Sequence, residues 1–361
     1  MNFMTDVFLI FVLGTLVLFV YKFKTVFFPL PANQADVLVL KREPFFDYLK
    51  GLAVISVIII HVFYFYLYKF GHVRIDLFTI INNVLRFTIA IFFICSGILL
   101  NPKVDNWLKF YQDKLVRIFI PYALAVLVIA LFYHQSSATF LYNLFSGQAA
   151  VPYYFIIVLL QFYLLYPALI IFRKKRWSIY AAFIITLVYY LIFGSLVVFG
   201  AYLFLEFLFF FFYGIYYRND FLQYQRARHK KELWFWGLII TLYLIYSLVY
   251  PIKLYNNRYF YGIAIFNLLF YFRNYLMSNS LVNKILTSFG RLSLWIFLLH
   301  FAVVYGCYYL INLASVNDYF NFFSVSILAI IISYLVAFMS FKLYNIAIIG
   351  LVKSMPKFFK L

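Results

Sequence analysis

Runs of about 20 mainly apolar residues recur along the chain and are separated by short polar segments. Such a run is long enough for an α-helix to cross the roughly 30 Å hydrocarbon core of a bilayer. The pattern therefore predicts an all-α, polytopic integral membrane protein with about eleven transmembrane helices. The predicted spans are residues 3–21, 46–66, 78–100, 116–133, 153–172, 179–198, 199–217, 233–250, 259–272, 292–311 and 322–343, with ends good to a few residues.

The first predicted span stands apart from the other ten. Residues 27–36, which follow it, contain Pro29 and Pro31, and these prolines disfavour a continuous helix. The run has no basic leading segment and no small-residue cleavage site, so we expect a retained helix rather than a signal peptide. We expect an extra N-terminal helix and connector at residues 1–40, a ten-helix membrane domain at 41–345, and a basic cytoplasmic tail at 346–361.

The composition excludes a soluble globular protein, because 67% of the residues are hydrophobic and only 11% are charged. Aromatic residues make up 25% of the chain, and many Tyr and Trp residues lie near the ends of the runs, where interfacial belts form. Both cysteines, Cys95 and Cys307, fall inside apolar runs. We therefore expect neither a disulfide nor a bound metal.

The net charge of +19 reports orientation rather than nucleic-acid binding. Most of the 30 Lys and Arg residues fall in alternate loops, and the other set of loops holds only Lys69, Arg74, Lys253 and Arg258. By the positive-inside rule, the basic loops and the C-terminus are cytoplasmic and the N-terminus lies outside. We expect a multi-pass protein of the plasma membrane, of the bacterial inner-membrane type. The most charged loop, residues 218–232, is interpreted as solvated.

Lys50 and His61 are the most informative pair of polar residues, because only apolar or small side chains separate them. Eleven steps of about 100° bring a helix back to within about 20° of its starting face. The two side chains therefore point the same way, about 16 Å apart along the helix axis. An ionisable side chain inside hydrocarbon is costly, so His61 is a candidate functional residue.

Other polar residues fall inside predicted spans. Arg86 near the outer start of the third span and Glu206 near the outer end of the seventh are expected at a depth similar to that of His61. Structural alternatives stay open: His61 could be a packing histidine, and Arg86 could reach a lipid headgroup. His300 and Gln161, both in the middle of spans, are interpreted as structural.

Several segments carry a resemblance to a known family, and they occur in the expected order. Over about residues 43–345, the chain resembles the acyltransferase 3 family of multi-spanning membrane acyltransferases. Lys50 and His61 resemble the Arg/Lys-x10-His signature of that family, with Lys in place of the commoner Arg. Tyr154 stands where Trp is frequent. The similar segments run from Asp47 to His61, Arg86 to Gly97, Lys114 to Tyr122, Tyr153 to Pro167 and Gly290 to His300.

The resemblance implies an enzyme that transfers acyl groups other than amino-acyl groups. The donor would be cytoplasmic acyl-CoA, expected to be acetyl-CoA, and it would be a substrate rather than a permanently bound cofactor. The acceptor would be a hydroxyl of a surface or exported glycan or glycolipid. The partners expected are therefore acyl-CoA, the acceptor and the lipid bilayer, and no nucleic acid.

Acyl transfer to an alcohol needs a general base and stabilisation of an oxyanion. We expect His61 to deprotonate the acceptor or to carry the acyl group transiently. Arg86 would stabilise the developing negative charge or position the acceptor, and Glu206 would orient a partner. The cations expected to hold the CoA phosphates are Lys50, Lys114 and Arg117.

Two other classes of protein stay open at this point. A transporter or exporter of a polysaccharide precursor or metabolite also has many spans and intramembrane charges. The sequence shows no internal repeat and no pair of helices broken by Gly or Pro, and both absences argue against a transporter. A purely structural subunit of a glycan-assembly complex is disfavoured by the intramembrane charges.

Overall fold

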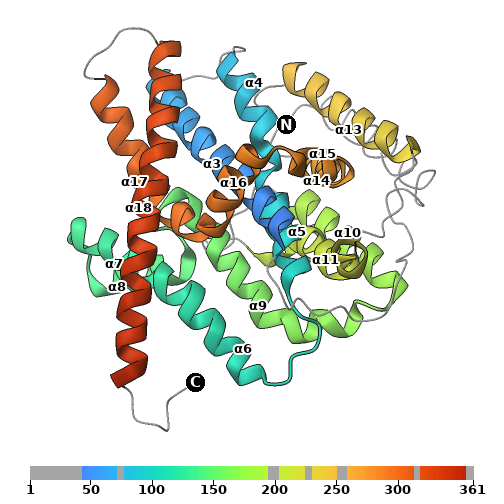
Figure 1. The fold of residues 1–361 in the computed structure, drawn as a ribbon, viewed down its shortest axis with the longest axis horizontal. Coiled ribbons are helices and arrows are strands. Elements are labelled where there is room, and N and C mark those ends of the chain that lie inside the picture. The colour runs from blue at the N-terminus through green and yellow to red at the C-terminus, as the bar shows by residue number, and fades with distance from the viewer. Residues whose placement is uncertain are drawn as a thin grey trace.

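The computed structural model describes residues 43–70, 77–193, 203–223, 230–249, 258–312 and 318–354. Within these ranges the regular structure is entirely helical (Figure 1). The predicted first span at 3–21, its connector and the end of the basic tail lie outside the described residues.

Seven helical segments in the described ranges are long and apolar enough to cross a membrane, so the chain is a multi-pass membrane protein. The predicted spans at 199–217 and 259–272 correspond to shorter apolar helices, Phe204–Tyr216 and Phe260–Tyr271. The total of eleven spanning helices therefore stays a prediction. The seven segments are Pro44–Tyr66, Leu77–Leu99, Trp107–Phe132, Val151–Phe172, Lys231–Leu248, Ser293–Ile311 and Asp318–Ala347.

Several spans consist of more than one helical segment. The segment Leu77–Leu99 combines two α-helices through a 3-10 turn at Leu85–Phe87, and the segment Trp107–Phe132 combines two α-helices through a π-helical turn at Leu115–Phe119. The elements are α3 (Pro44–Phe70), α4 (Leu77–Val84), η1 (Leu85–Phe87), α5 (Thr88–Leu99), α6 (Trp107–Lys114), η2 (Leu115–Phe119), α7 (Ile120–Phe132), α8 (Ser137–Ser146), η3 (Val151–Tyr153), α9 (Tyr154–Phe172), α10 (Arg176–Phe193), η5 (Phe204–Phe207), α11 (Leu208–Tyr216), α12 (Arg218–Leu222), α13 (Lys230–Val249), α14 (Arg258–Tyr271), α15 (Arg273–Ser278), α16 (Ser280–Arg291), α17 (Ser293–Asn312) and α18 (Asp318–Ser354).

A very close helix contact joins α3 to α16 and depends on two glycines. A Cβ atom at Gly51 would lie 1.9 Å from the carbonyl oxygen of Leu286, and one at Gly290 would lie 1.8 Å from that of Asp47. Only glycine allows two backbones to approach this closely. The contact fixes the start of α3, with Lys50, beside the end of α16, with Arg291.

A buried cation closes the C-terminal end of α5. The Arg218 Nε donates a hydrogen bond of 2.7 Å to the Leu100 carbonyl oxygen, and its Nη2 donates one of 3.2 Å to Asn101 Oδ1. Burial lowers the pKa of Arg218 to about 10, so its charge persists at neutral pH and complements the helix dipole. The interpretation of residues 218–232 as a solvated loop is wrong at its start, because Arg218, Asn219 and Asp220 are buried.

Candidate active site

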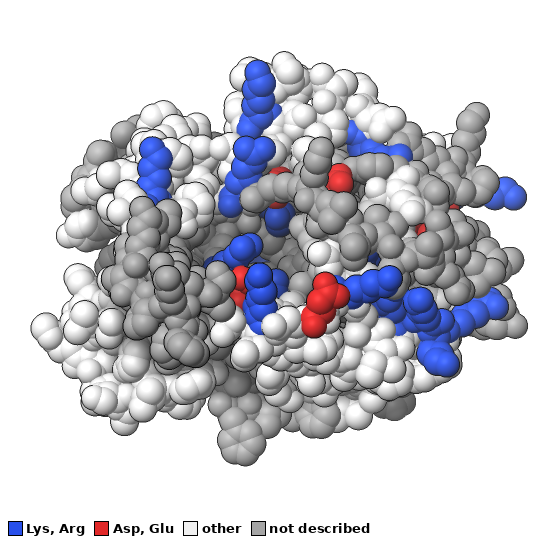
Figure 2. All heavy atoms as spheres, turned by 60° about the horizontal axis from the view of Figure 1, so that its bottom comes forward, with Lys and Arg blue, Asp and Glu red and all other residues white. Residues whose placement is uncertain are grey.

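A cleft of about 300 Å³ opens among five segments of the chain. Four basic side chains, Lys50, Lys114, Arg117 and Arg291, are among its lining residues. Figure 2 turns the lower face of Figure 1 toward the viewer, and Lys and Arg side chains gather there around a hollow. The remaining lining residues are Phe92, Ser96, Leu99, Leu100, Ile118, Phe155, Leu159, Tyr163, Gly290, Ser293, Leu294 and Phe297.

Local structure holds each cation in a different way. The Lys50 Nζ lies 2.8 Å from Oδ1 of the buried Asp47, so this cation is paired. The Lys114 Nζ lies 4.6 Å from the centre of the Tyr163 ring, a cation–π contact. Arg117 belongs to the π-helical turn η2, which begins directly after Lys114. Pro121, just after this turn, has no N–H to donate to the carbonyl four residues earlier, which favours the π-helical turn.

Aromatic rings form the apolar end of the cleft. The Phe297 ring centre lies 5.0 Å from that of Phe155 and 6.3 Å from that of Phe92. Phe297 also contacts the ring of His300, one helical turn further along α17, at 5.7 Å between ring centres. The cleft therefore leads from four cations to within one helical turn of His300.

His61 and His300 contact each other across α3 and α17. The His300 Nε2 lies 3.2 Å from the His61 Nδ1, and the ring centres are 4.9 Å apart. The His61 Nδ1 also lies 2.8 Å from the Val57 carbonyl oxygen, and the His300 Nδ1 lies 2.8 Å from that of Phe297. His300 is fully buried, whereas His61 is half-buried.

Arg86 and Glu206, the two charged residues expected near His61, act on different groups. Arg86, on η1, is close enough for its positive charge to act on the His61 imidazole. Glu206 lies on η5, and its carboxylate acts on Tyr189 of α10. Gln161 contributes a structural contact, because its Oε1 accepts a hydrogen bond of 2.8 Å from the Phe204 N–H.

The sequence matches the acyltransferase 3 family model, described as an acyltransferase domain, over residues 43–341. This match covers more than four-fifths of the chain. The protein belongs to the acyltransferase 3 family. Comparison with curated proteins and with solved structures gives no match.

The cleft of this membrane acyltransferase contains one cation that sequence reasoning missed, Arg291. The hydropathy pattern predicts a loop between the spans at 259–272 and 292–311, whereas the structure has two helices there, α15 and α16. Arg291 ends α16 and follows Gly290, so the close contact of α16 with α3 brings it to the cleft. The sequence feature that could have pointed to Arg291 is its position in the segment from Gly290 to His300, which resembles the family.

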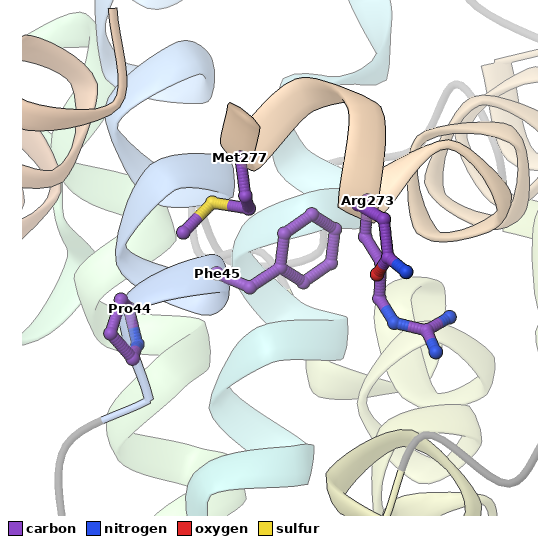
Figure 3. A pocket seen from close by; sticks show the side chains of 5 residues that line it. Pro44, Phe45, Arg273 and Met277 are labelled. Carbon is purple, nitrogen blue, oxygen red and sulfur yellow. The ribbon is translucent and has the colours of Figure 1, made fainter. Parts of the chain in front are cut away.

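A second cavity of the acyltransferase, of about 220 Å³, lies where α3 begins against α15 (Figure 3). The ring of Phe45 lies between Met277 and Arg273. The Arg273 guanidinium is 4.7 Å from the centre of the Phe270 ring and donates a hydrogen bond of 3.4 Å to the Phe270 carbonyl. Among the described residues, one basic side chain lines this cavity, in contrast to the four in the main cleft.

No metal site is found within the described ranges, where no three His, Cys, Asp or Glu side chains are grouped to hold an ion. Both cysteines are buried and carry free thiols.

Proposed function

We propose that this acyltransferase moves an acetyl group from cytoplasmic acetyl-CoA to a hydroxyl of a surface or exported glycan or glycolipid. The protein would lie in the plasma membrane, with the cleft open to the cytoplasm and the C-terminus on the same side. One observation carries the proposal. A cleft lined by four basic side chains leads to within one helical turn of a histidine pair.

The cations support a phosphorylated donor. Coenzyme A carries several phosphate charges, which Lys and Arg side chains bind through charge-assisted hydrogen bonds. Arg117 and Arg291 supply planar guanidinium groups suited to two-point contact with phosphate, and Lys114 supplies a point charge. Lys50 is partly neutralised by Asp47, so its proposed contribution to phosphate binding is smaller.

The aromatic end of the cleft supports a short acyl group. The pantetheine arm would extend from the cations toward Phe92, Phe155 and Phe297 and deliver the thioester near His300 and His61. Packed rings leave little room for a long chain at this point. This constraint favours acetyl over longer acyl groups.

The proposed transfer is a single addition and elimination. His61 Nε2 takes the proton from the acceptor hydroxyl as its oxygen attacks the thioester carbonyl. The carbon–oxygen bond forms, the carbon–sulfur bond breaks, and the CoA thiolate takes the proton back from His61. Arg86 would stabilise the oxyanion of the tetrahedral intermediate, and Glu206 would orient a partner on the acceptor side.

Heating the purified protein with acetyl-CoA tests the donor site. A ligand present at 100 times its dissociation constant stabilises a folded protein by about 2.7 kcal/mol. We expect acetyl-CoA to raise the unfolding temperature and acetyl-dephospho-CoA, which differs only in lacking the 3′-phosphate, to raise it less. We also expect labelled acetyl to pass from acetyl-CoA to isolated surface glycan. No protection and no transfer would contradict the proposal.

A further inference from the structure

The two histidines have different surroundings, although they are in contact. His300 has no exposed surface, and its Nδ1 faces the carbonyl oxygens of Phe297 and Ile296 at 2.8 and 3.1 Å. His61 is half-buried, and the edge of its ring packs against Phe301 at 5.5 Å between ring centres. Of the two histidines, therefore, only His61 has exposed surface.

For two neutral rings, the hydrogen bonds around the pair admit one consistent assignment of protons. The His300 Nδ1 faces only carbonyl oxygens, which accept, so it must carry a hydrogen. The Nε2 of a neutral His300 is then an acceptor, and the His61 Nδ1 opposite it must donate. The same His61 N–H points at the Val57 carbonyl, 2.8 Å away. A His300 protonated on both nitrogens would leave the His61 Nδ1 as an acceptor facing a second acceptor.

We infer that His300 is a positioning residue that, together with the Val57 carbonyl, holds His61 as its Nδ1–H tautomer and leaves the Nε2 lone pair for the acceptor hydroxyl. The tautomer of a histidine is set by the hydrogen bond that its other nitrogen makes. A histidine side chain in water favours the Nε2–H tautomer, and the contacts of the His61 Nδ1 with His300 and with the Val57 carbonyl both oppose that preference. The role of this tautomer in acyl transfer rests on the proposed function, but the tautomer itself can be measured without any assay of activity.

The same contact explains how the charge formed during transfer is supported. When Nε2 of His61 takes the acceptor's proton, the ring becomes an imidazolium and its Nδ1–H bonds strengthen. The His300 lone pair and the Val57 carbonyl receive that N–H. His300 thus has the orienting role that a carboxylate has in a Ser-His-Asp triad, without placing a second charge in the membrane.

Nitrogen NMR of the full-length protein in detergent, labelled at histidine, measures the tautomer directly. The chain has only five histidines, and the signals missing from His61→Gln identify His61. We expect the wild-type His61 to show a protonated Nδ1 and an unprotonated Nε2. In His300→Leu only the Val57 carbonyl still accepts from the His61 Nδ1–H, so we expect the fraction of the Nε2–H tautomer of His61 to rise.

Transfer kinetics with two further variants separate positioning from packing. The Gln side chain places an amide oxygen near the former Nε2 position, whereas Asn reaches only the former Nδ1 position. We expect His300→Asn and His300→Leu to lower kcat about 100-fold with the KM for acetyl-CoA changed less than about twofold. We expect His300→Gln to recover at least about a tenth of the wild-type kcat, together with the Nδ1–H tautomer.

Two results would overturn the inference: a wild-type His61 protonated on Nε2, or a His61 tautomer unchanged in both His300→Leu and His300→Asn. If His300→Leu does not fold, the wild-type spectrum and the comparison of His300→Asn with His300→Gln still test the positioning role of His300. A protein that shows the expected tautomer but transfers no acetyl group would refute the proposed function and leave the tautomer assignment standing.

Discussion

At the scale of single residues, the charges in the cleft are not equivalent. Lys50 is paired with Asp47, and Lys114 lies against the rings of Tyr163 and Phe110. Arg291 adds a guanidinium from the end of α16, a helix that the hydropathy pattern does not predict. We therefore expect Arg291 to contribute strongly to donor binding.

Replacing Arg291 by alanine tests that expectation. Loss of a charge-assisted hydrogen bond to phosphate costs about 1.5–3 kcal/mol, which corresponds to a 10- to 100-fold rise in KM for acetyl-CoA. Lys284 lies on the same helix and is exposed outside the cleft, so Lys284→Ala is the matched control and should change KM less than about twofold. Equal effects of the two variants would indicate nonspecific attraction by the basic face.

Phe297 is predicted to limit the length of the acyl group. Its ring packs against both Phe155 and His300, at the end of the cleft. Phe297→Ala should raise the rate with butyryl-CoA relative to acetyl-CoA about tenfold, because it removes a buried ring from the path. The exposed Phe132 at the end of α7 provides a control, and Phe132→Ala should leave the ratio unchanged. An unchanged ratio in Phe297→Ala would place the acyl group elsewhere.

At the scale of helices, α16 decides the shape of the cleft. It touches α3 at Gly51 and Gly290, and its Ser288 hydroxyl is 2.6 Å from the Tyr334 hydroxyl of α18. The short polar stretch that forms α16 gives no hydropathy signal for a span. Its position depends on contacts with helices far away in the sequence, so the hydropathy pattern could not predict it.

Alanine at either glycine should loosen this contact. Each added Cβ would lie under 2 Å from a backbone atom of the facing helix, so Gly51→Ala and Gly290→Ala should each destabilise the protein by about 1–3 kcal/mol or more. Gly237 and Gly306 also lie in helices, but an added methyl group there would meet no atom of another described segment within 4 Å. Their alanine variants should be neutral or stabilising by up to about 1 kcal/mol. Thermal unfolding in detergent measures all four, and equal effects would contradict the close contact.

At the scale of the whole molecule, hydropathy predicts the membrane class and much of the helix order. Most predicted spans overlap helices of the structure, because apolar runs are local properties of the chain. The shared face of Lys50 and His61 follows from helix geometry alone, and both lie on the single helix α3. The contact of His61 with His300 spans 239 residues, so no local pattern could predict it.

The proposed orientation places the cleft toward the cytoplasm, and cysteine labelling tests it. Both native cysteines are buried, so background labelling by a membrane-impermeant maleimide should be low. Asp105, just before α6, and Ala138, on α8, are exposed beyond opposite ends of the span Trp107–Phe132. We expect Ala138→Cys to react with the maleimide in intact cells and Asp105→Cys to react only after the cells are permeabilised. The reverse pattern would invert the proposed topology.

The most direct test of His61 as the group that drives transfer is NMR detection of acyl esters on the cell's surface glycans. Cells that lack the gene would carry either the wild-type protein or His61→Gln, with membrane abundance of the two matched by immunoblot. We predict ester signals with the wild type and none with His61→Gln. Ester signals of equal intensity in both would contradict the role of His61.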